Sequence, residues 1–213
     1  MHILNSFFDR IYCINLDHRT DRWEICEKLF KETNLEVNRV SPIVIGDETH
    51  CCMNKPQLSL FRTHKNLIVE AKNQNLKNVL IFEDDVEFCD EVENYNGKSL
   101  EERFYSSIDF LPNNWNVFFL GSGIYTDNKS LIGGEIYKIG YAMTTHALAI
   151  NSTYYDTIIK ILDTESDILD NIYCRLMSQN ETFSFHPNLI SQRESFSDIE
   201  NKHVNYTALR NFM

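Results

Sequence analysis

Short apolar runs alternate with amphipathic segments along this chain, and that alternation limits the folds it can adopt. Apolar runs of strand length occur in the segments 10–16, 78–82 and 115–120. Between them lie segments whose apolar residues recur at helical spacing, as in 17–33 and 58–75. Strands that alternate with helices predict a mainly parallel sheet that is covered on both faces. We therefore expect an α/β fold, with all 213 residues in one domain, 1–213.

The boundaries of several elements can also be predicted. The helix in 17–33 is expected to be capped by Asp17 or Thr20. A second strand is predicted over 38–45, closed by Pro42 and Gly46. Later in the chain we expect helices over 99–112, from about residue 152 and over 165–179, and an extended segment over 182–199.

Charge and hydropathy exclude some kinds of partner. The formal net charge is −11 and the pI is about 5.0, so no nucleic acid is expected to be held by general electrostatics. A phosphorylated ligand held by a few arginines or a metal stays open. No window is apolar enough to cross a bilayer, and the N-terminus lacks the basic start of a signal peptide. We expect a soluble cytoplasmic protein and leave peripheral membrane association open.

Three consecutive carboxylates, Glu83, Asp84 and Asp85, directly follow the apolar run 78–82. Their mutual repulsion is unfavourable unless something offsets it. In a parallel sheet, ligands bind beyond the carboxyl ends of the strands, where this run would meet the end of the strand 10–16. A divalent cation, Mn²⁺ or Mg²⁺, would remove the repulsion and could bridge two phosphates. The alternative is an acidic strand end that is solvated or caps a helix.

Four stretches of the chain, in order, resemble glycosyltransferase family 25, which includes bacterial lipooligosaccharide galactosyltransferases and collagen β-galactosyltransferases. They are "RIYCINLDHRTDRWE", "SLFRTHKNLIVEAKNQNLKNVLIFEDDVEF", "IGYAMTTHALAINSTYYDTII" and "HPNLISQRESFSDI". The resemblance spans roughly Phe8 to Ile199. The chain departs from the family pattern at Thr63, where a Ser is usual, at the missing Gly-Cys before it, and at His146.

The resemblance implies a single GT-A-type catalytic domain with a Rossmann-like, mostly parallel sheet. It also implies an inverting, metal-dependent transferase that uses Mn²⁺ or Mg²⁺. The donor would be a UDP-sugar, typically UDP-galactose or UDP-glucose, and the acceptor a hydroxyl of a glycan or glycoconjugate. A different class of protein stays open, namely a catalytically degenerate relative that serves as a carbohydrate-binding or scaffold module.

Metal and catalytic roles follow from the resemblance. Asp85 is the first expected metal ligand and Glu83 the second, while His186 is expected to complete the metal shell. Asp170 is the expected base for the acceptor hydroxyl, with Asp167 as its substitute. The alternatives are a loop role for His186, and a helix cap and a surface charge for the two aspartates.

Donor-binding roles fall on residues spread along most of the chain. Arg19 and Arg22 can grip phosphate or a uracil carbonyl, or can instead form ordinary surface ion pairs. The histidines in this group could equally be core residues. The residues expected to bind or orient the donor are Asn15, Asp17, Arg19, Arg22, His64, Asp84, His146, Gln192 and Asp198.

Overall fold

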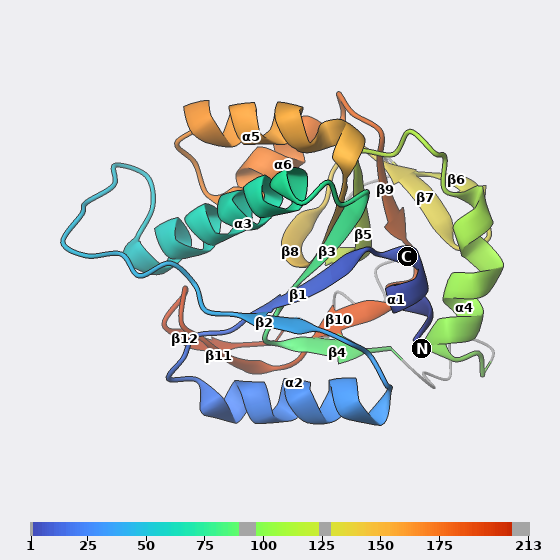
Figure 1. Ribbon diagram of the computed structural model, residues 1–213, viewed down its shortest axis with the longest axis horizontal. Helices are drawn as coiled ribbons and strands as arrows, with labels where there is room; N and C mark the ends of the chain where they lie inside the picture. Colours follow the sequence, from blue (N-terminus) through green and yellow to red (C-terminus); the bar gives the residue numbers. More distant parts are fainter. Residues whose placement is uncertain (1, 90–96, 124–128, 206–213) are drawn as a thin grey trace.

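An eight-stranded sheet runs through the centre of the protein, in the order β2-β1-β3-β8-β5-β9-β7-β6 (Figure 1). The computed structural model describes residues 2–89, 97–123 and 129–205. The strands are β1 (Arg10–Ile14), β2 (Asn38–Val40), β3 (Asn78–Glu83), β5 (Val117–Gly123), β6 (Lys129–Gly133), β7 (Ile136–Ile139), β8 (Met143–Asn151) and β9 (Thr182–Phe185). Only β7 and β8 run against the other six strands. The predicted α/β fold with a mostly parallel sheet is confirmed.

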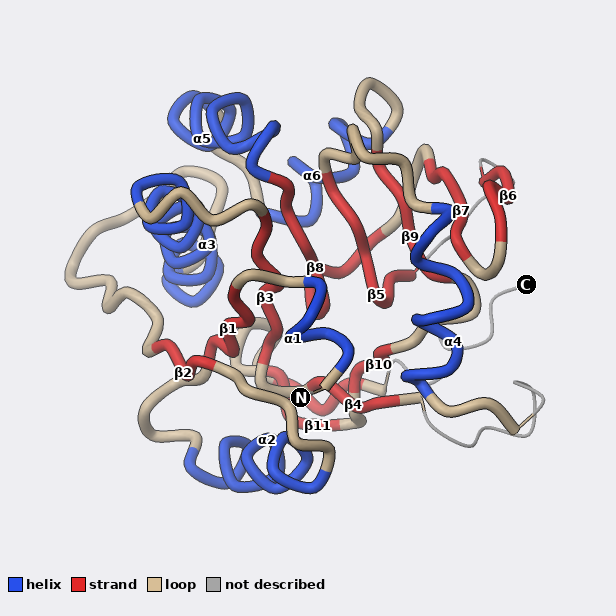
Figure 2. The backbone as a smooth tube through the Cα atoms, turned by 45° about the vertical axis from the view of Figure 1, so that its right-hand side comes forward, coloured by secondary structure: helices blue, strands red, loops and turns tan. Residues whose placement is uncertain are grey.

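Helices cover both faces of this sheet (Figure 2). One layer consists of α3 (Lys55–Asn73), α5 (Tyr155–Thr164) and α6 (Leu169–Met177), and the other of α1 (Ile3–Phe7), α2 (Thr20–Glu32) and α4 (Leu100–Ser107). Two short 3-10 helices, η2 (Ile108–Phe110) and η3 (Ser152–Tyr154), adjoin α4 and α5. None of the helices in the described part of the chain is long and apolar enough to cross a membrane.

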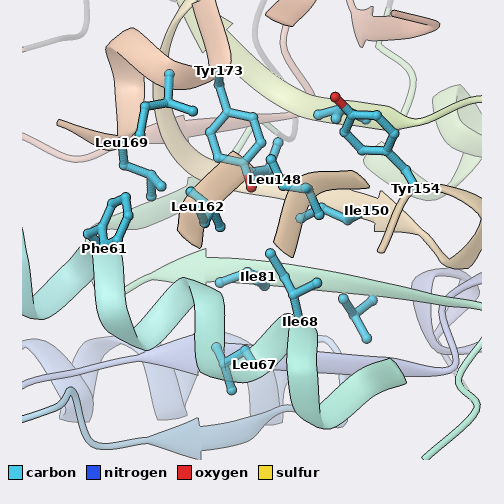
Figure 3. Packing of buried hydrophobic residues seen from close by; sticks show 14 of the residues in the cluster. Phe61, Leu67, Ile68, Ile81, Leu148, Ile150, Tyr154, Leu162, Leu169 and Tyr173 are labelled. Carbon is cyan, nitrogen blue, oxygen red and sulfur yellow. The ribbon is translucent and has the colours of Figure 1, made fainter. Parts of the chain in front are cut away.

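Successive side chains along each strand point to opposite faces of the sheet and so enter two hydrophobic cores. Val79 and Ile81 of β3 enter the core beneath α3, α5 and α6, whereas Leu80 and Phe82 enter the core beneath α1, α2 and α4. Figure 3 shows the first core, where Ile68 of α3 lies over the sheet. Burying one such side chain contributes about 1.5–3 kcal/mol. This packing fixes the first turn of α6 at the end of the sheet where the parallel strands have their carboxyl ends.

The chain leaves the main sheet at the acidic residues. β3 ends at Glu83, a turn follows at Asp84 and Asp85, and β4 (Val86–Phe88) then pairs with β10 (Ile190–Gln192). A further two-stranded sheet joins β11 (Ser195–Ser197) to β12 (Lys202–Val204). The closing segment of the chain is therefore brought beside the acidic turn, although more than a hundred residues separate them in sequence.

Several predicted boundaries were wrong. The helix expected over 165–179 begins only at Leu169, and the helix expected over 99–112 ends at Ser107, where η2 follows. The N-cap of α2 is Arg19, without a side-chain hydrogen bond, rather than Asp17 or Thr20. The second strand stops at Val40, and residues 41–54 form a long loop. The third helix begins at Lys55, because Asn54 and Gln57 form a capping box that starts it a turn earlier than the apolar pattern indicates.

Candidate active site

A cleft opens where β1 and β3 end, since these strands are parallel and Ile14 lies beside Glu83 in the register. It has a larger compartment of about 440 Å³ and a smaller one of about 130 Å³. The two compartments share five lining residues, namely Leu60, Glu83, Asp85, Ser197 and Ile199. Two of the three consecutive carboxylates therefore stand at the boundary between the compartments.

The larger compartment has a mainly apolar wall. Much of that wall comes from the loop 41–54, and its apolar residues are Ile14, Leu16, Pro42, Ile43, Val44, Ile45, Leu60 and Ile199. Val44 is 90% exposed, so it contributes to the wall without being packed in the core. The charged groups in the lining are Arg22, Lys55, Glu83, Asp84, Asp85 and Asp198. The apolar wall suits a flat apolar group.

The smaller compartment is lined mostly by polar side chains from the ends of regular elements. Thr144 and Thr145 come from the start of β8, Asp170 from the first turn of α6 and Gln192 from the end of β10. β8 runs against β3, so its start lies at the same sheet edge as Glu83. These groups offer hydrogen bonds of the kind that sugar hydroxyls need.

Asp84 is fully occupied by protein contacts. Its carboxylate forms an ion pair with Arg22 and accepts a hydrogen bond from Asn15 Nδ2 at 2.7 Å. Its backbone carbonyl accepts hydrogen bonds from Arg193 Nη2 at 2.7 Å and from the Cys26 thiol at 3.2 Å. These contacts fix the acidic turn, and Asp84 would have to give them up in order to bind a ligand.

Asp85 has unused bonding capacity. Asp85 is only 7% exposed, and its Oδ1 atom has no hydrogen-bond partner among the described residues. Oδ2 receives only a long hydrogen bond of 3.4 Å from Gln192 Nε2, and the nearest guanidinium nitrogen, on Arg22, is 3.9 Å away. A buried carboxylate oxygen without a partner is costly, so this atom is suited to a ligand.

The carboxylates raise one another's affinity for protons. Burial, with the neighbouring charges of Asp85 and Asp170, raises the pKa of Glu83 to about 8, although Thr145 Oγ1 donates to it at 3.0 Å. Burial also raises the pKa of Asp85, partly offset by Arg22, and burial raises the pKa of Asp170. Carboxyl groups with raised pKa values in a cleft are characteristic of catalytic and cation-binding sites.

The two candidate bases have different surroundings. Asp170 lines the smaller compartment and is largely buried. Asp167 lies outside both compartments, where it pairs with Arg175 at 2.6 Å and accepts a hydrogen bond from Asn171 at 3.1 Å. These contacts hold the pKa of Asp167 below its usual range. Of the two candidate bases Asp170 is therefore better placed, because the carboxylate of Asp167 is committed to a surface ion pair.

The predicted donor-binding residues at the N-terminal end divide into lining and supporting groups. Arg22 lines the larger compartment. Asn15 is buried beneath it, between Asp84 and Arg39. Arg19 pairs with Asp21 and Asp198, of which only Asp198 reaches the compartment. Asp17 is exposed and accepts a hydrogen bond from Ser41 at 2.5 Å, which ties the end of β1 to the loop 41–54.

None of the three predicted histidines lines the cleft. His64 is fully buried in α3, neither ring nitrogen has a partner in the described part of the chain, and burial lowers its pKa to about 3. His146 is buried behind the smaller compartment. His186 lies beside Lys129, with its Nε2 atom 2.8 Å from Nζ, and beside the ring of Tyr137. These contacts place His186 beside β6 and β7, and its role as a metal ligand stays a prediction.

Sequence reasoning missed four contributors, Thr144, Thr145, Arg193 and Leu60. Arg193 stands within the closing motif "SQRESFSDI", and its backbone N–H also donates to the Asp85 carbonyl at 2.7 Å. Only that motif could have indicated one of these residues from the sequence, because a pair of threonines is common in strands. Within residues 2–89, 97–123 and 129–205, no three His, Cys, Asp or Glu side chains are grouped to hold a metal ion.

Comparisons with known proteins agree with the fold and with the resemblance in the sequence. Over 101 residues the chain is 33% identical to a "Glycosyltransferase 25 family member" of Drosophila melanogaster, a match over 38% of this chain and 16% of that protein. The chain thus matches only a small part of that relative's length. No family model matches the chain.

A solved structure shares the fold. It is a glycosyltransferase involved in the glycosylation of the major capsid of PBCV-1, with a TM-score of 0.53 and 12% identity over 90% of this chain and 95% of that one. At that identity the likeness establishes the fold alone. The relative that is similar in sequence over part of the chain and the structure that shares the fold are both described as glycosyltransferases.

Proposed function

We propose that this protein is a metal-dependent, inverting glycosyltransferase that transfers a hexose, galactose or glucose, from a UDP-sugar to a hydroxyl of a glycan or glycoconjugate. The observation that carries the proposal is the buried Oδ1 of Asp85, which has no hydrogen-bond partner within the described part of the chain and lies at the boundary between an apolar and a polar compartment. Such an atom is expected where a cation and a diphosphate meet. The sequence similarity to a family 25 member and the shared glycosyltransferase fold support it.

The two compartments suit the two halves of a nucleotide-sugar. The apolar wall of the larger compartment suits a nucleobase, while Arg22 and Lys55 offer positive charge to a phosphate. The polar lining of the smaller compartment suits the hydroxyls of a hexose. In this arrangement the diphosphate lies at the shared wall formed by Glu83 and Asp85.

Glu83 and Asp85 fit a cation that is completed by its substrate. Mg²⁺ is typically bound by one or two carboxylates together with substrate phosphates and waters, and such a site needs no third protein ligand. The raised pKa of Glu83 also fits, because a bound cation would stabilise the charged form. When bound, the cation would neutralise charge on the departing diphosphate.

Asp170 is the proposed general base. The acceptor oxygen attacks the anomeric carbon, the bond from that carbon to the diphosphate oxygen breaks, and the acceptor proton passes to Asp170 while UDP leaves. Attack opposite the leaving group inverts the anomeric configuration. Burial favours proton uptake at Asp170, because it raises the pKa of this carboxyl.

UDP release from a panel of UDP-sugars would test the proposal, with Mn²⁺, with Mg²⁺ and with EDTA. We expect cation-dependent hydrolysis or transfer with one donor. Asp85→Asn should reduce it about 100-fold or more, because it removes a charge on which the cation and diphosphate depend. Asp109→Asn is the matched control, since Asp109 is exposed on η2 and lines neither compartment.

Two results would count against the proposal. Equal activity with EDTA and with Mn²⁺ would remove the cation from the reaction. Sugar binding without any UDP release, in the presence of glycan acceptors, would instead favour a carbohydrate-binding module that has lost its activity.

A further inference from the structure

The backbone of Thr144 is in a conformation that its side chain disfavours. Its φ is +76°, in the left-handed region, where β-branched residues are rarely found. Such a conformation is unfavourable and persists only when its surroundings enforce it. Thr144 also lines the smaller compartment, next to Thr145, which donates to Glu83. The strained residue is therefore at the cleft and not in a remote turn.

His146 fixes the direction of the hydrogen bond made by Thr144. Nε2 of His146 lies 3.1 Å from the carbonyl oxygen of Ile190, which can only accept, so Nε2 carries the proton. Burial lowers the pKa of His146 to about 4, which leaves the ring neutral and Nδ1 without a proton. Nδ1 lies 3.0 Å from Thr144 Oγ1, so the threonine hydroxyl must donate to it.

The surroundings hold this histidine in place. A Cβ atom at Gly121 would lie 1.7 Å from the Ile190 carbonyl oxygen and 2.9 Å from His146 Nε2. Only glycine permits this close approach of β5, β10 and the imidazole. The chain from the Ile190 carbonyl through His146 to Thr144 is thus tightly packed, and the ring cannot reorient without moving two strands.

It follows that Thr144 Oγ1 has no proton left for a ligand. Its oxygen retains acceptor capacity, so a group that hydrogen-bonds to it from the compartment must be a donor. A sugar hydroxyl satisfies that condition, whereas a fluorine or a hydrogen at the same carbon does not. Thr145 is different, since its hydroxyl is already engaged with Glu83.

We propose that Thr144 is a specificity-determining residue that accepts a hydrogen bond from one hydroxyl of the donor sugar. The inference rests on the proposed function, because it takes the ligand of the smaller compartment to be a hexose. His146 acts through Thr144 and does not touch the sugar; it is a positioning residue. The strain at Thr144 is retained because it turns the hydroxyl oxygen toward both His146 and the compartment.

Thr144→Val is the decisive variant, because valine keeps the branched shape and removes only the hydroxyl. Binding of UDP-galactose, UDP-glucose and their singly deoxyfluorinated analogues would be measured by calorimetry for the wild type and the variant. Wild type should bind one fluorinated analogue about 3- to 10-fold more weakly than its parent sugar, as expected for one neutral hydrogen bond. Thr144→Val should bind the parent and that analogue equally.

Thr144→Ser should restore the discrimination, since it restores the hydroxyl. It also keeps the test open if Thr144→Val fails to fold. Discrimination that persists in Thr144→Val, or that is absent in the wild type although UDP-sugars bind, would overturn the role of Thr144 and leave the proposed function intact. Absence of any UDP-sugar binding by the wild type would overturn the proposed function itself, and this inference with it.

Discussion

The two compartments of the cleft are built in different ways. The wall of the larger one depends on the loop 41–54, whose Val44 is almost fully exposed, while the smaller one is formed by the ends of β8, β10 and α6. A loop with few buried contacts can adjust to its ligand at low cost. Atoms at the ends of packed elements are held in place, as catalytic geometry requires. We infer that the larger compartment determines the affinity for UDP and that the smaller one carries out the chemistry.

The sharpest test of this division uses two aspartates three residues apart. Asp170→Asn removes the proposed base from the smaller compartment and should lower turnover about 100- to 10,000-fold, the range typical of general bases. Binding of UDP should stay close to that of the wild type, because the larger compartment is unchanged. Turnover would be measured with saturating donor and UDP binding by calorimetry.

Asp167→Asn is the control, since Asp167 pairs with Arg175 outside both compartments. It should keep wild-type turnover and lose at most about 1 kcal/mol of stability, as for other surface ion pairs. If both variants lost turnover equally, the smaller compartment would not be the place of the chemistry. If Asp170→Asn lost UDP binding instead of turnover, the division between the compartments would fail.

The contrast between Asp167 and Asp170 also marks a limit of sequence reasoning. The α/β fold, the strand before the acidic run and the place of that run at the end of β3 were predictable, because apolar periodicity is a property of local sequence. The choice between two aspartates depends on where α6 begins, since Asp170 lies in its first turn whereas Asp167 precedes the helix, and on Arg175 of α6, which pairs with Asp167. No local pattern in "ESDILDNIYCRL" encodes which carboxylate is buried.

Long-range contacts explain the other differences. The resemblance assigned Asp85 to the cation and Asp84 to the donor, but the local pattern does not show that Asp84 pairs with Arg22 and Asn15. His186 was expected near the carboxylates, but the sheet order puts β8 and β5 between β3 and β9. The φ of Thr144 results from packing around His146, and the sequence "MTTHALAI" reads only as a strand.

Glu83 provides a second test, smaller in effect, at the wall that the compartments share. Its pKa of about 8 exceeds its ordinary value of 4.5, so the folded protein binds this proton more tightly than the unfolded chain. In the absence of a cation, the free energy of unfolding should therefore fall as the pH rises between these two pKa values. Glu83→Gln cannot ionise, and we expect it to be about 1–3 kcal/mol more stable than wild type at pH ~9.

Urea denaturation in EDTA at about pH 5 and pH 9 would measure this difference. Glu24→Gln is the matched control, because Glu24 is exposed on α2, and it should change stability by less than about 0.5 kcal/mol at either pH. A Glu83→Gln variant equally stable to wild type at both pH values would mean that Glu83 is well solvated. The wall between the compartments would then be open to water.

The smallest expected effect concerns the loop-built wall. Val44→Ser should weaken UDP binding about 3- to 10-fold, on the order of 1 kcal/mol of lost apolar contact. It should leave the free energy of unfolding unchanged, because Val44 is 90% exposed and has no core packing to lose. Turnover at saturating donor should also be unchanged, since the smaller compartment keeps all its groups.

Ile25→Ser is the control for Val44→Ser, as Ile25 is an exposed apolar residue, 51% accessible, on α2 and away from both compartments. It should bind UDP as tightly as the wild type. If Val44→Ser lowered saturated turnover but not UDP binding, the loop 41–54 would act on the chemistry. The adaptable wall and the rigid wall could then no longer be assigned to binding and to chemistry separately. Val44, a residue without core contacts, would control the reacting groups.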